Sequence, residues 1–216
     1  GKRRDKMLCD LGETMQTILV VLLLIALLVC VALMLYTSWR HDRDKAVYFA
    51  IMVTGVFLYV LGDLLEVLSS TNAAVINALC VKSMGIPLIA PFFLFFVMSL
   101  FQPDAMRRWM LPAGLGFAAF VFLSVLFNER HHLYYASIDM LASDTHGRCL
   151  KLGYGPLYVV QQVVSIGCML GAYIVLFRRY LCGTRMIRQQ MRLIMIGALF
   201  ALVASILNVS GVMPEG

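Results

Sequence analysis

Three ionisable residues stand in apolar stretches of this 216-residue chain, where charge is costly. Asp63 and Glu66 are three positions apart, so a helix would project both carboxylates from one face. Lys82 lies in the apolar stretch that follows. Ionised groups in such stretches usually face a cavity or one another. Two interpretations are open, namely a polar pocket framed by Lys82 and Glu66 and an interhelical ion pair that sets packing. The two are compatible, because a ligand can exchange into the pair.

Side-chain amides are the other candidate contacts of such a pocket. Gln161 and Gln162 are adjacent in one apolar stretch, and Asn208 lies late in another. Amides within a helical membrane bundle often form hydrogen bonds only to neighbouring helices. Each such bond stabilises the bundle by about 0.6 kcal/mol on average. They contact a ligand only if they converge on the side of Glu66 and Lys82, so both roles stay open.

A histidine pair begins the longest connection between apolar stretches. His131 and His132, with His146 and Cys149 further on, invite a zinc site. Zinc takes three or four ligands in tetrahedral geometry, whereas adjacent histidines in irregular backbone rarely bind one ion. The sequence also holds no CxxC or HxxxH frame. We therefore expect no metal and no cofactor. The pair is expected to anchor this connection over the helix bundle, with pH sensitivity because free histidine titrates near pH ~6.5. His131 and His132 are also candidate ligand contacts.

Cys80 and Cys149 are the candidates for a disulfide. Both are expected on the external side of the membrane, where disulfides persist. A bond between them would tie the longest connection to the third apolar stretch. Because the Cβ separation decides whether a disulfide forms, free thiols remain the alternative.

Motifs of catalysis are missing from the sequence. It contains no Gly-x-Ser-x-Gly elbow, no Gly-x-x-x-x-Gly-Lys loop and no His-Glu-x-x-His helix. Asp63 and Glu66 are residue types that can act as a general acid and a general base, but no nucleophile and no set of metal ligands accompanies them. No catalytic residue is therefore assigned in this chain.

The composition identifies the environment in which these residues act. Hydrophobic residues make up 61% of the chain and charged residues 14%, against about 45–50% and about 25% in soluble domains. Soluble, disordered and disulfide-dense secreted classes are thereby excluded. The net charge of +6 sits in short clusters between apolar runs. It therefore indicates loops at an anionic membrane surface and no nucleic-acid partner.

Six apolar runs predict six membrane-spanning helices. Each reaches the length of about 20 residues that a helix needs to cross the hydrocarbon core. We expect an all-α polytopic membrane protein, in which an N-terminal tail of residues 1–13 precedes a transmembrane bundle over residues 14–212. The six expected helices cover residues 14–39, 46–68, 74–101, 109–127, 156–177 and 193–212.

Residues 128–155 form the one long connection and are expected to fold as a small β-hairpin lid. Two loosely alternating stretches flank the turn-forming run Asp144-Thr-His-Gly. Lys and Arg are concentrated in the first, third and fifth connections, which places these loops in the cytoplasm and the lid and N-terminus outside. The basic residues among the first six positions oppose this assignment, and the loops are given more weight than the tail.

Several segments, in order, resemble the N-terminal seven-helix sensor region of bacterial membrane histidine kinases. Apolar helices match one another easily, but the order of the segments and the double histidine before the long loop are harder to obtain by chance. The seventh helix of that family and an output domain are not in this sequence. The similar segments are Tyr59-Val-Leu-Gly-Asp-Leu-Leu-Glu-Val-Leu-Ser69, Met84-Gly-Ile-Pro-Leu-Ile-Ala-Pro-Phe-Phe-Leu-Phe-Phe96, Asn128-Glu-Arg-His-His-Leu-Tyr-Tyr135, Gly153-Tyr-Gly-Pro-Leu-Tyr158, and Arg188-Gln-Gln with Ile196-Gly-Ala-Leu and Asn208.

The resemblance implies a ligand-sensing receptor of a two-component system. On this hypothesis the chain lies in the bacterial inner membrane, binds an external small molecule or lipid-like ligand beneath the lid, and acts as a homodimer through the full-length histidine kinase. The alternative is a transporter or permease subunit with Asp63, Glu66 and Lys82 on a substrate path. A transporter predicts charge at the membrane midplane and inverted repeats, and no repeat is found in the sequence.

Overall fold

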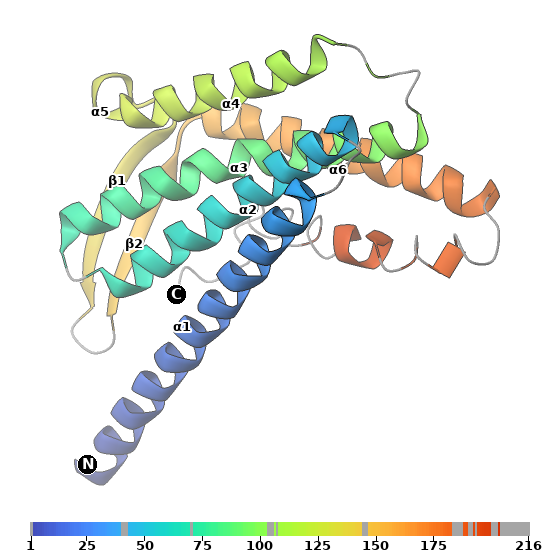
Figure 1. The fold of residues 1–216 in the computed structure, drawn as a ribbon. Coiled ribbons are helices and arrows are strands. Elements are labelled where there is room, and N and C mark those ends of the chain that lie inside the picture. The colour runs from blue at the N-terminus through green and yellow to red at the C-terminus, as the bar shows by residue number, and fades with distance from the viewer. Residues whose placement is uncertain are drawn as a thin grey trace.

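The computed structural model describes residues 2–39, 43–69, 71–102, 106, 108–143, 147–182, 188–189, 192, 194–199 and 203. Most of this part is helical, as the apolar runs predict, and it carries one two-stranded sheet (Figure 1). The elements in chain order are α1 (Lys2–Ser38), α2 (Arg43–Leu68), α3 (Asn72–Phe101), α4 (Met110–Leu126), α5 (Asn128–His131), β1 (Tyr135–Ser143), β2 (Gly147–Tyr154) and α6 (Pro156–Cys182).

Four of the described helices are long and apolar enough to cross a membrane. They are Thr14–Thr37 within α1, Ala46–Leu68 within α2, Ala73–Phe101 within α3, and Pro156–Cys182, which is α6. The prediction of a polytopic helical membrane protein is thereby confirmed for the described part of the chain.

The fourth predicted span is shorter than expected. α4 is apolar but has 17 residues, fewer than the roughly 20 that a spanning helix needs. The chain turns at Phe127, which is the C-cap of α4 and the N-cap of α5, so the apolar run does not extend the helix. The last predicted span, residues 193–212, lies mostly outside the described residues.

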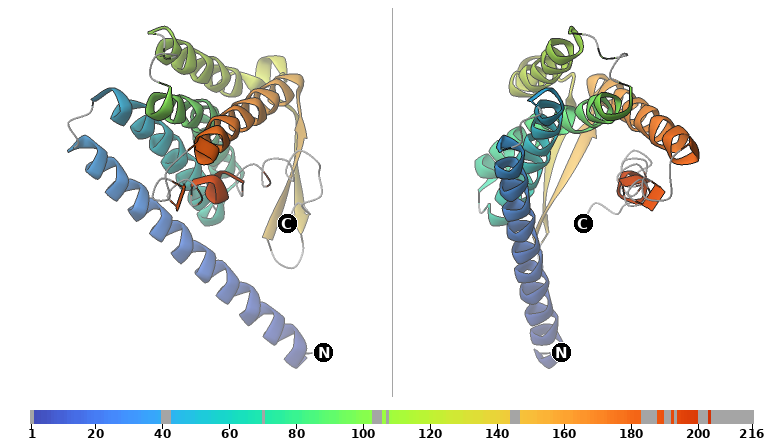
Figure 2. Two further views of the ribbon diagram at one scale, coloured as in Figure 1. Left: turned by 90° about the vertical axis from the view of Figure 1, so that its right-hand side faces the viewer. Right: turned by 45° about the vertical axis from the view of Figure 1, so that its right-hand side comes forward.

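Helix α3 is the centre of the bundle. It packs against α2, α4 and α6, whereas α1 packs against α2. Both views in Figure 2 show α1 leaving the bundle, with no other described element beside its N-terminal half. α3 continues through Pro87 and Pro91, and Pro87 is fully buried among its neighbours. Membrane helices tolerate such prolines where neighbouring helices pack closely against them, as α2, α4 and α6 do here.

Glycines bring α2 and α3 into backbone contact. A Cβ added at Gly62 would lie 2.7 Å from the Cβ of Lys82, and one added at Gly55 would lie 2.8 Å from the Cβ of Leu88. A Cβ at Gly85 would overlap the backbone of Gly55 on α2. Small residues at a helix interface let two backbones approach closely. The register of α3 along α2 is therefore fixed by steric fit.

The predicted β-hairpin is confirmed. β1 and β2 pair in antiparallel register from Tyr135 opposite Tyr154 to Ser143 opposite Gly147, with an irregularity between Tyr135 and Ser137. The hairpin lies on the side of the bundle where α2 ends and α3 begins (Figure 1). It leaves α4 through α5 and returns directly into α6, so its base lies among three helices.

Candidate functional site

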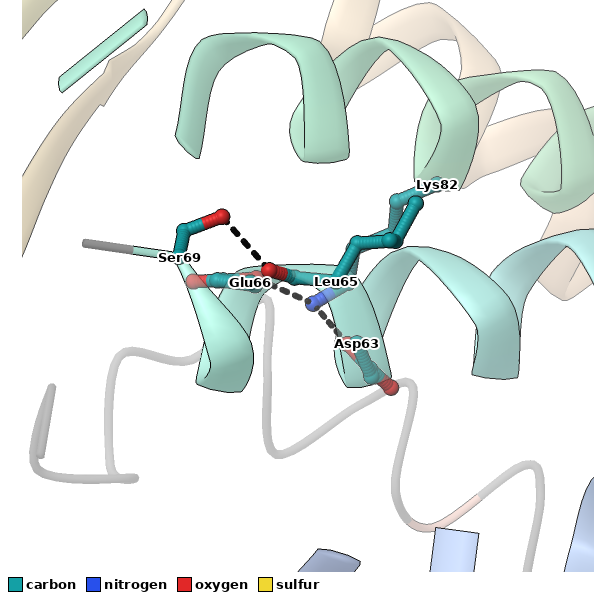
Figure 3. Close-up of polar contacts among 5 residues, drawn as sticks. All are labelled: Asp63, Leu65, Glu66, Ser69 and Lys82. Atoms are coloured by element: carbon teal, nitrogen blue, oxygen red, sulfur yellow. Dashed lines mark hydrogen bonds and ion pairs between the residues drawn. The ribbon is translucent and has the colours of Figure 1, made fainter. Parts of the chain in front are cut away.

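The three charged residues in the apolar stretches meet in one ion cluster, made of Asp63, Glu66 and Lys82. The ammonium Nζ of Lys82 lies 2.5 Å from Oδ1 of Asp63 and 3.5 Å from Oε2 of Glu66. Figure 3 shows Lys82 reaching from α3 to the two carboxylates on α2. The side chains are between a quarter and a third exposed. The cluster is half-buried and carries one excess negative charge.

Local sequence explains why these side chains meet. Gly62 allows the backbone of Lys82 to approach α2, which places the base of the lysine side chain beside Asp63. Glu66 follows Asp63 by three positions and shares its helical face. The hydroxyl of Ser69 donates to the carbonyl of Leu65 at 2.5 Å (Figure 3), so it satisfies its own helix and leaves both carboxylates to Lys82.

An aromatic ring also faces the lysine. The Lys82 ammonium lies 5.1 Å from the ring centroid of Tyr59, which is within the range of a cation–π interaction. Tyr59 lies one turn before Asp63 on α2. On α3, Cys80 precedes Lys82 by two positions and packs against a buried cluster that includes Tyr158 of α6, so α6 lies next to this part of α3.

The two predicted glutamines of α6 bind tyrosine hydroxyls. Tyr134 donates its hydroxyl to Oε1 of Gln161 at 2.5 Å, and Gln162 donates from Nε2 to the hydroxyl of Tyr158 at 2.8 Å. Gln161 is fully buried. In the structure the amides thus belong to the base of the hairpin, where both bind tyrosine hydroxyls, and the bonds described for them do not reach the ion cluster.

Four tyrosines form a cluster where the hairpin meets α6. Tyr134 packs edge-on against Tyr135 and Tyr158, at centroid separations of 4.8 Å and 5.7 Å, and Tyr154 stacks on Tyr158 at 4.1 Å. We refer to these residues as the tyrosine cluster. Its site role was not predicted from sequence, although the Tyr134–Tyr135 pair and the Tyr-Gly-Pro-Leu-Tyr run through Tyr158 were visible signals.

Burial fixes the protonation state of this cluster. The side chains of Tyr134 and Tyr135 are almost completely excluded from solvent. Burial raises the pKa of both hydroxyls well above the ordinary tyrosine value, and neighbouring tyrosines raise it further. Both phenols keep their protons throughout the physiological range, so Tyr134 remains a hydrogen-bond donor to Gln161.

Asn128 attaches the hairpin to the helices. Its Oδ1 accepts from the backbone N–H groups of Tyr134 and Tyr135, both at 3.0 Å, and its Nδ2 donates to the carbonyl of Tyr135 at 2.9 Å. Gly155 closes the other side, because its N–H donates to the carbonyl of Tyr134 at 2.8 Å. A Cβ at Gly155 would overlap the carbonyl of Leu133.

Replacing Asn128 with Ala should loosen the base of the hairpin. The change removes three hydrogen bonds and leaves two buried backbone N–H groups without an acceptor, at a cost of about 2 kcal/mol. Amide hydrogen exchange of a peptide that covers Tyr134 and Tyr135 should then speed up by about 30-fold, the factor that corresponds to this energy. Asn77→Ala is the matched control, since Asn77 is exposed on α3. Equal protection in both variants would contradict the anchoring role of Asn128.

The histidine pair has a local backbone role. His131 accepts at Nδ1 from the N–H of Leu133 at 3.2 Å. His132 ends α5 with a φ of 49° in the left-handed region, so it turns the chain toward β1. In the part of the chain that the structure describes, no group of three or more metal-binding side chains occurs.

Other predicted residues do not enter the described site. Cys80 carries a free thiol and packs beside the tyrosine cluster, so the structure does not have the predicted bond from Cys80 to Cys149 and agrees with the alternative of free thiols. The side chain of Cys149, as well as His146 and Asn208, lies outside the described part of the structure. The role of Asn208 therefore stays a prediction.

Several long apolar helices around a charged interhelical cluster define a polytopic helical membrane protein. A family model described as the N-terminal 7TM region of histidine kinase matches residues 22–216, and the chain belongs to this family. A comparison with curated proteins finds no match.

Proposed function

We propose that the chain senses an external small molecule or lipid-like ligand and relays the signal to a histidine kinase. In this proposal the full-length protein is a homodimer in the bacterial inner membrane, with the hairpin and N-terminus outside. The observation that carries the proposal is the closeness of the ion cluster to the base of the hairpin. Cys80, two positions before Lys82 on α3, packs against the buried cluster that holds Tyr134 and Tyr158, and Tyr134 in turn binds Gln161.

The cost of the ion cluster supports a functional site. An ionised side chain costs about 2.5–3.5 kcal/mol at the centre of a membrane helix on insertion scales and less toward the helix end, where Asp63 and Glu66 lie on α2. Apolar side chains would join α2 and α3 without this cost, and the glycine contacts already hold the two helices together. Glu66, at 3.5 Å from Lys82, is the more weakly held carboxylate, and it is the one that a ligand can replace.

The rigidity of the α2–α3 pair suggests the direction of the relay. Because glycine contacts fix the register of these two helices, a ligand changes the site most readily at its other wall, where Tyr158 and Gln161 lie on α6. A ligand passes a signal only if it binds one helix arrangement more tightly than the other. Movement of α6 relative to α3 is the rearrangement that we propose.

The test uses the full-length kinase in lipid nanodiscs and measures autophosphorylation with labelled ATP. The stimulus is an organic extract of the culture medium of the source cells, with extract of sterile medium as the blank. Glu66→Gln and Lys82→Met should each reduce the stimulated change in rate by about tenfold, the effect of losing one charged contact of about 1.4 kcal/mol.

Thr54→Val is the matched control on α2. Its hydroxyl donates to the carbonyl of Ala50 in its own helix, and it lies outside the ion cluster. This variant should respond like the wild type. A full response in both Glu66→Gln and Lys82→Met would exclude the ion cluster as the ligand site.

A further inference from the structure

Two buried polar groups on α6 have no hydrogen-bond partner among the described residues. They are Nε2 of Gln161 and Oγ of Ser165. Gln161 is 0% exposed and Ser165 is 7% exposed. The residues are four positions apart and therefore share one helical face. The two groups form a polar patch one turn long inside the bundle.

Ser165 differs from the other buried serines of the described chain. Ser83, Ser99 and Ser124 each donate their hydroxyl to a carbonyl of the preceding helical turn, at 2.7–2.8 Å. The same local bond is open to any helical serine, yet Ser165 does not make it. Its hydroxyl is thus turned away from its own backbone and is available to another group.

Gln161 is held in place by one end of its amide only. Tyr134 donates to Oε1, which fixes the amide and leaves the two N–H bonds of Nε2 as donors. Buried polar groups without a partner are costly and rare in native proteins. Gln161 and Ser165 are therefore oriented to bind a hydrogen-bond acceptor that reaches this face of α6 when the helices move apart.

The surroundings limit what that acceptor can be. The same buried face of α6 continues with Tyr158 before the patch and Met169 after it, and neither supplies a charge. Lys82 on the neighbouring α3 is already paired with Asp63 and Glu66. An ionised acceptor would lose its hydration without gaining a counter-ion. An uncharged oxygen avoids this loss.

We infer that Gln161 and Ser165 form a subsite for the uncharged carbonyl or hydroxyl oxygen of an amphipathic ligand. The inference rests on the proposed function and adds to it, because it names the chemistry of the ligand at a place separate from the ion cluster. The apolar part of a ligand can lie along the same buried face of α6, where Met169 follows Ser165 by four positions. The oxygen can belong to a water-borne molecule or to a membrane lipid.

The test measures thermal unfolding of the purified protein with four octyl probes of equal chain length. Octanamide and 1-octanol carry an uncharged oxygen, whereas octanoate and octylammonium are charged. The uncharged probes should raise the melting temperature of the wild type. Ser165→Ala should weaken their apparent affinity by about 3- to 10-fold, the effect of one hydrogen bond.

Two further variants keep the test specific. Ser83→Ala removes a buried hydroxyl that bonds its own helix, and its probe affinity should equal that of the wild type. Gln161→Glu retains an oxygen that can accept from Tyr134 but loses the amide donor, and it should bind the uncharged probes as weakly as Ser165→Ala. Equal affinity of the wild type and Ser165→Ala, or tighter binding of the charged probes, would overturn the subsite.

A second arm identifies the source of the oxygen. Monooleoylglycerol is added to nanodiscs of phosphatidylcholine, and binding is read by native mass spectrometry. If the wild type retains monooleoylglycerol and Ser165→Ala does not, the subsite binds a lipid. If the octyl probes bind but monooleoylglycerol is not retained, the subsite binds a water-borne ligand. Absence of binding in both arms overturns the inference. The kinase response of the Glu66 and Lys82 variants is independent of all these readings, so the two proposals fail separately.

Discussion

Replacing Lys82 with Met is expected to destabilise the protein by about 2 kcal/mol, because two carboxylates then share a half-buried site without a cation. Removing one partner of a fully buried pair costs about 3–5 kcal/mol. The side chains of the ion cluster are between 25% and 33% exposed, and the value is reduced accordingly. Thermal unfolding in detergent, followed by circular dichroism, measures the change.

Neutralising the partners should reverse this loss. In the triple variant Lys82→Met, Asp63→Asn and Glu66→Gln no unpaired charge remains, and replacing a whole ion cluster by uncharged groups is often neutral. Its melting temperature should return close to that of the wild type. Asp63→Asn alone should be milder than Lys82→Met, since the lysine still has Glu66 at 3.5 Å. Equal melting temperatures for Lys82→Met and the triple variant would show that charge compensation is not what the cluster provides.

The parts of the fold that could be predicted are those set by short sequence patterns. Apolar runs of sufficient length predict the spans within α1, α2, α3 and α6. Alternation around a turn predicts the hairpin. The three-residue spacing of Asp63 and Glu66 predicts a shared face, and the scarcity of other charges leaves Lys82 as a partner. Each of these inferences depends on one helix or strand at a time.

The parts that could not be predicted depend on which face of a helix meets which neighbour. An apolar helix buried on several sides has no polar face to show its orientation. α3 contacts three helices, so its sequence does not reveal that Gly85 meets α2. Tyrosine is as compatible with a membrane surface as with a core. The tyrosine cluster and its bond to Gln161 therefore emerge only from the structure.

Replacing Gly85 with Ala is expected to be at least as damaging as losing Lys82. The added Cβ would lie 2.8 Å from the backbone nitrogen of Tyr59 and would overlap the carbonyl of Gly55. Both are backbone atoms of α2 and cannot rotate away as a side chain can. Overpacking of this kind costs about 1–3 kcal/mol, and we expect the upper end, because α2 and α3 must separate along their contact.

The same substitution at Gly167 is the matched control. A Cβ there meets nothing within 4 Å, so alanine should raise stability by about 0.5–1 kcal/mol through its higher helix propensity. The melting temperatures of both variants are measured in the same detergent. A decrease for Gly85→Ala and an increase for Gly167→Ala would assign the destabilisation to the α2–α3 contact. If Gly85→Ala melted like Gly167→Ala, the helices would not be in backbone contact. The fixed register from which we infer movement of α6 would then be lost.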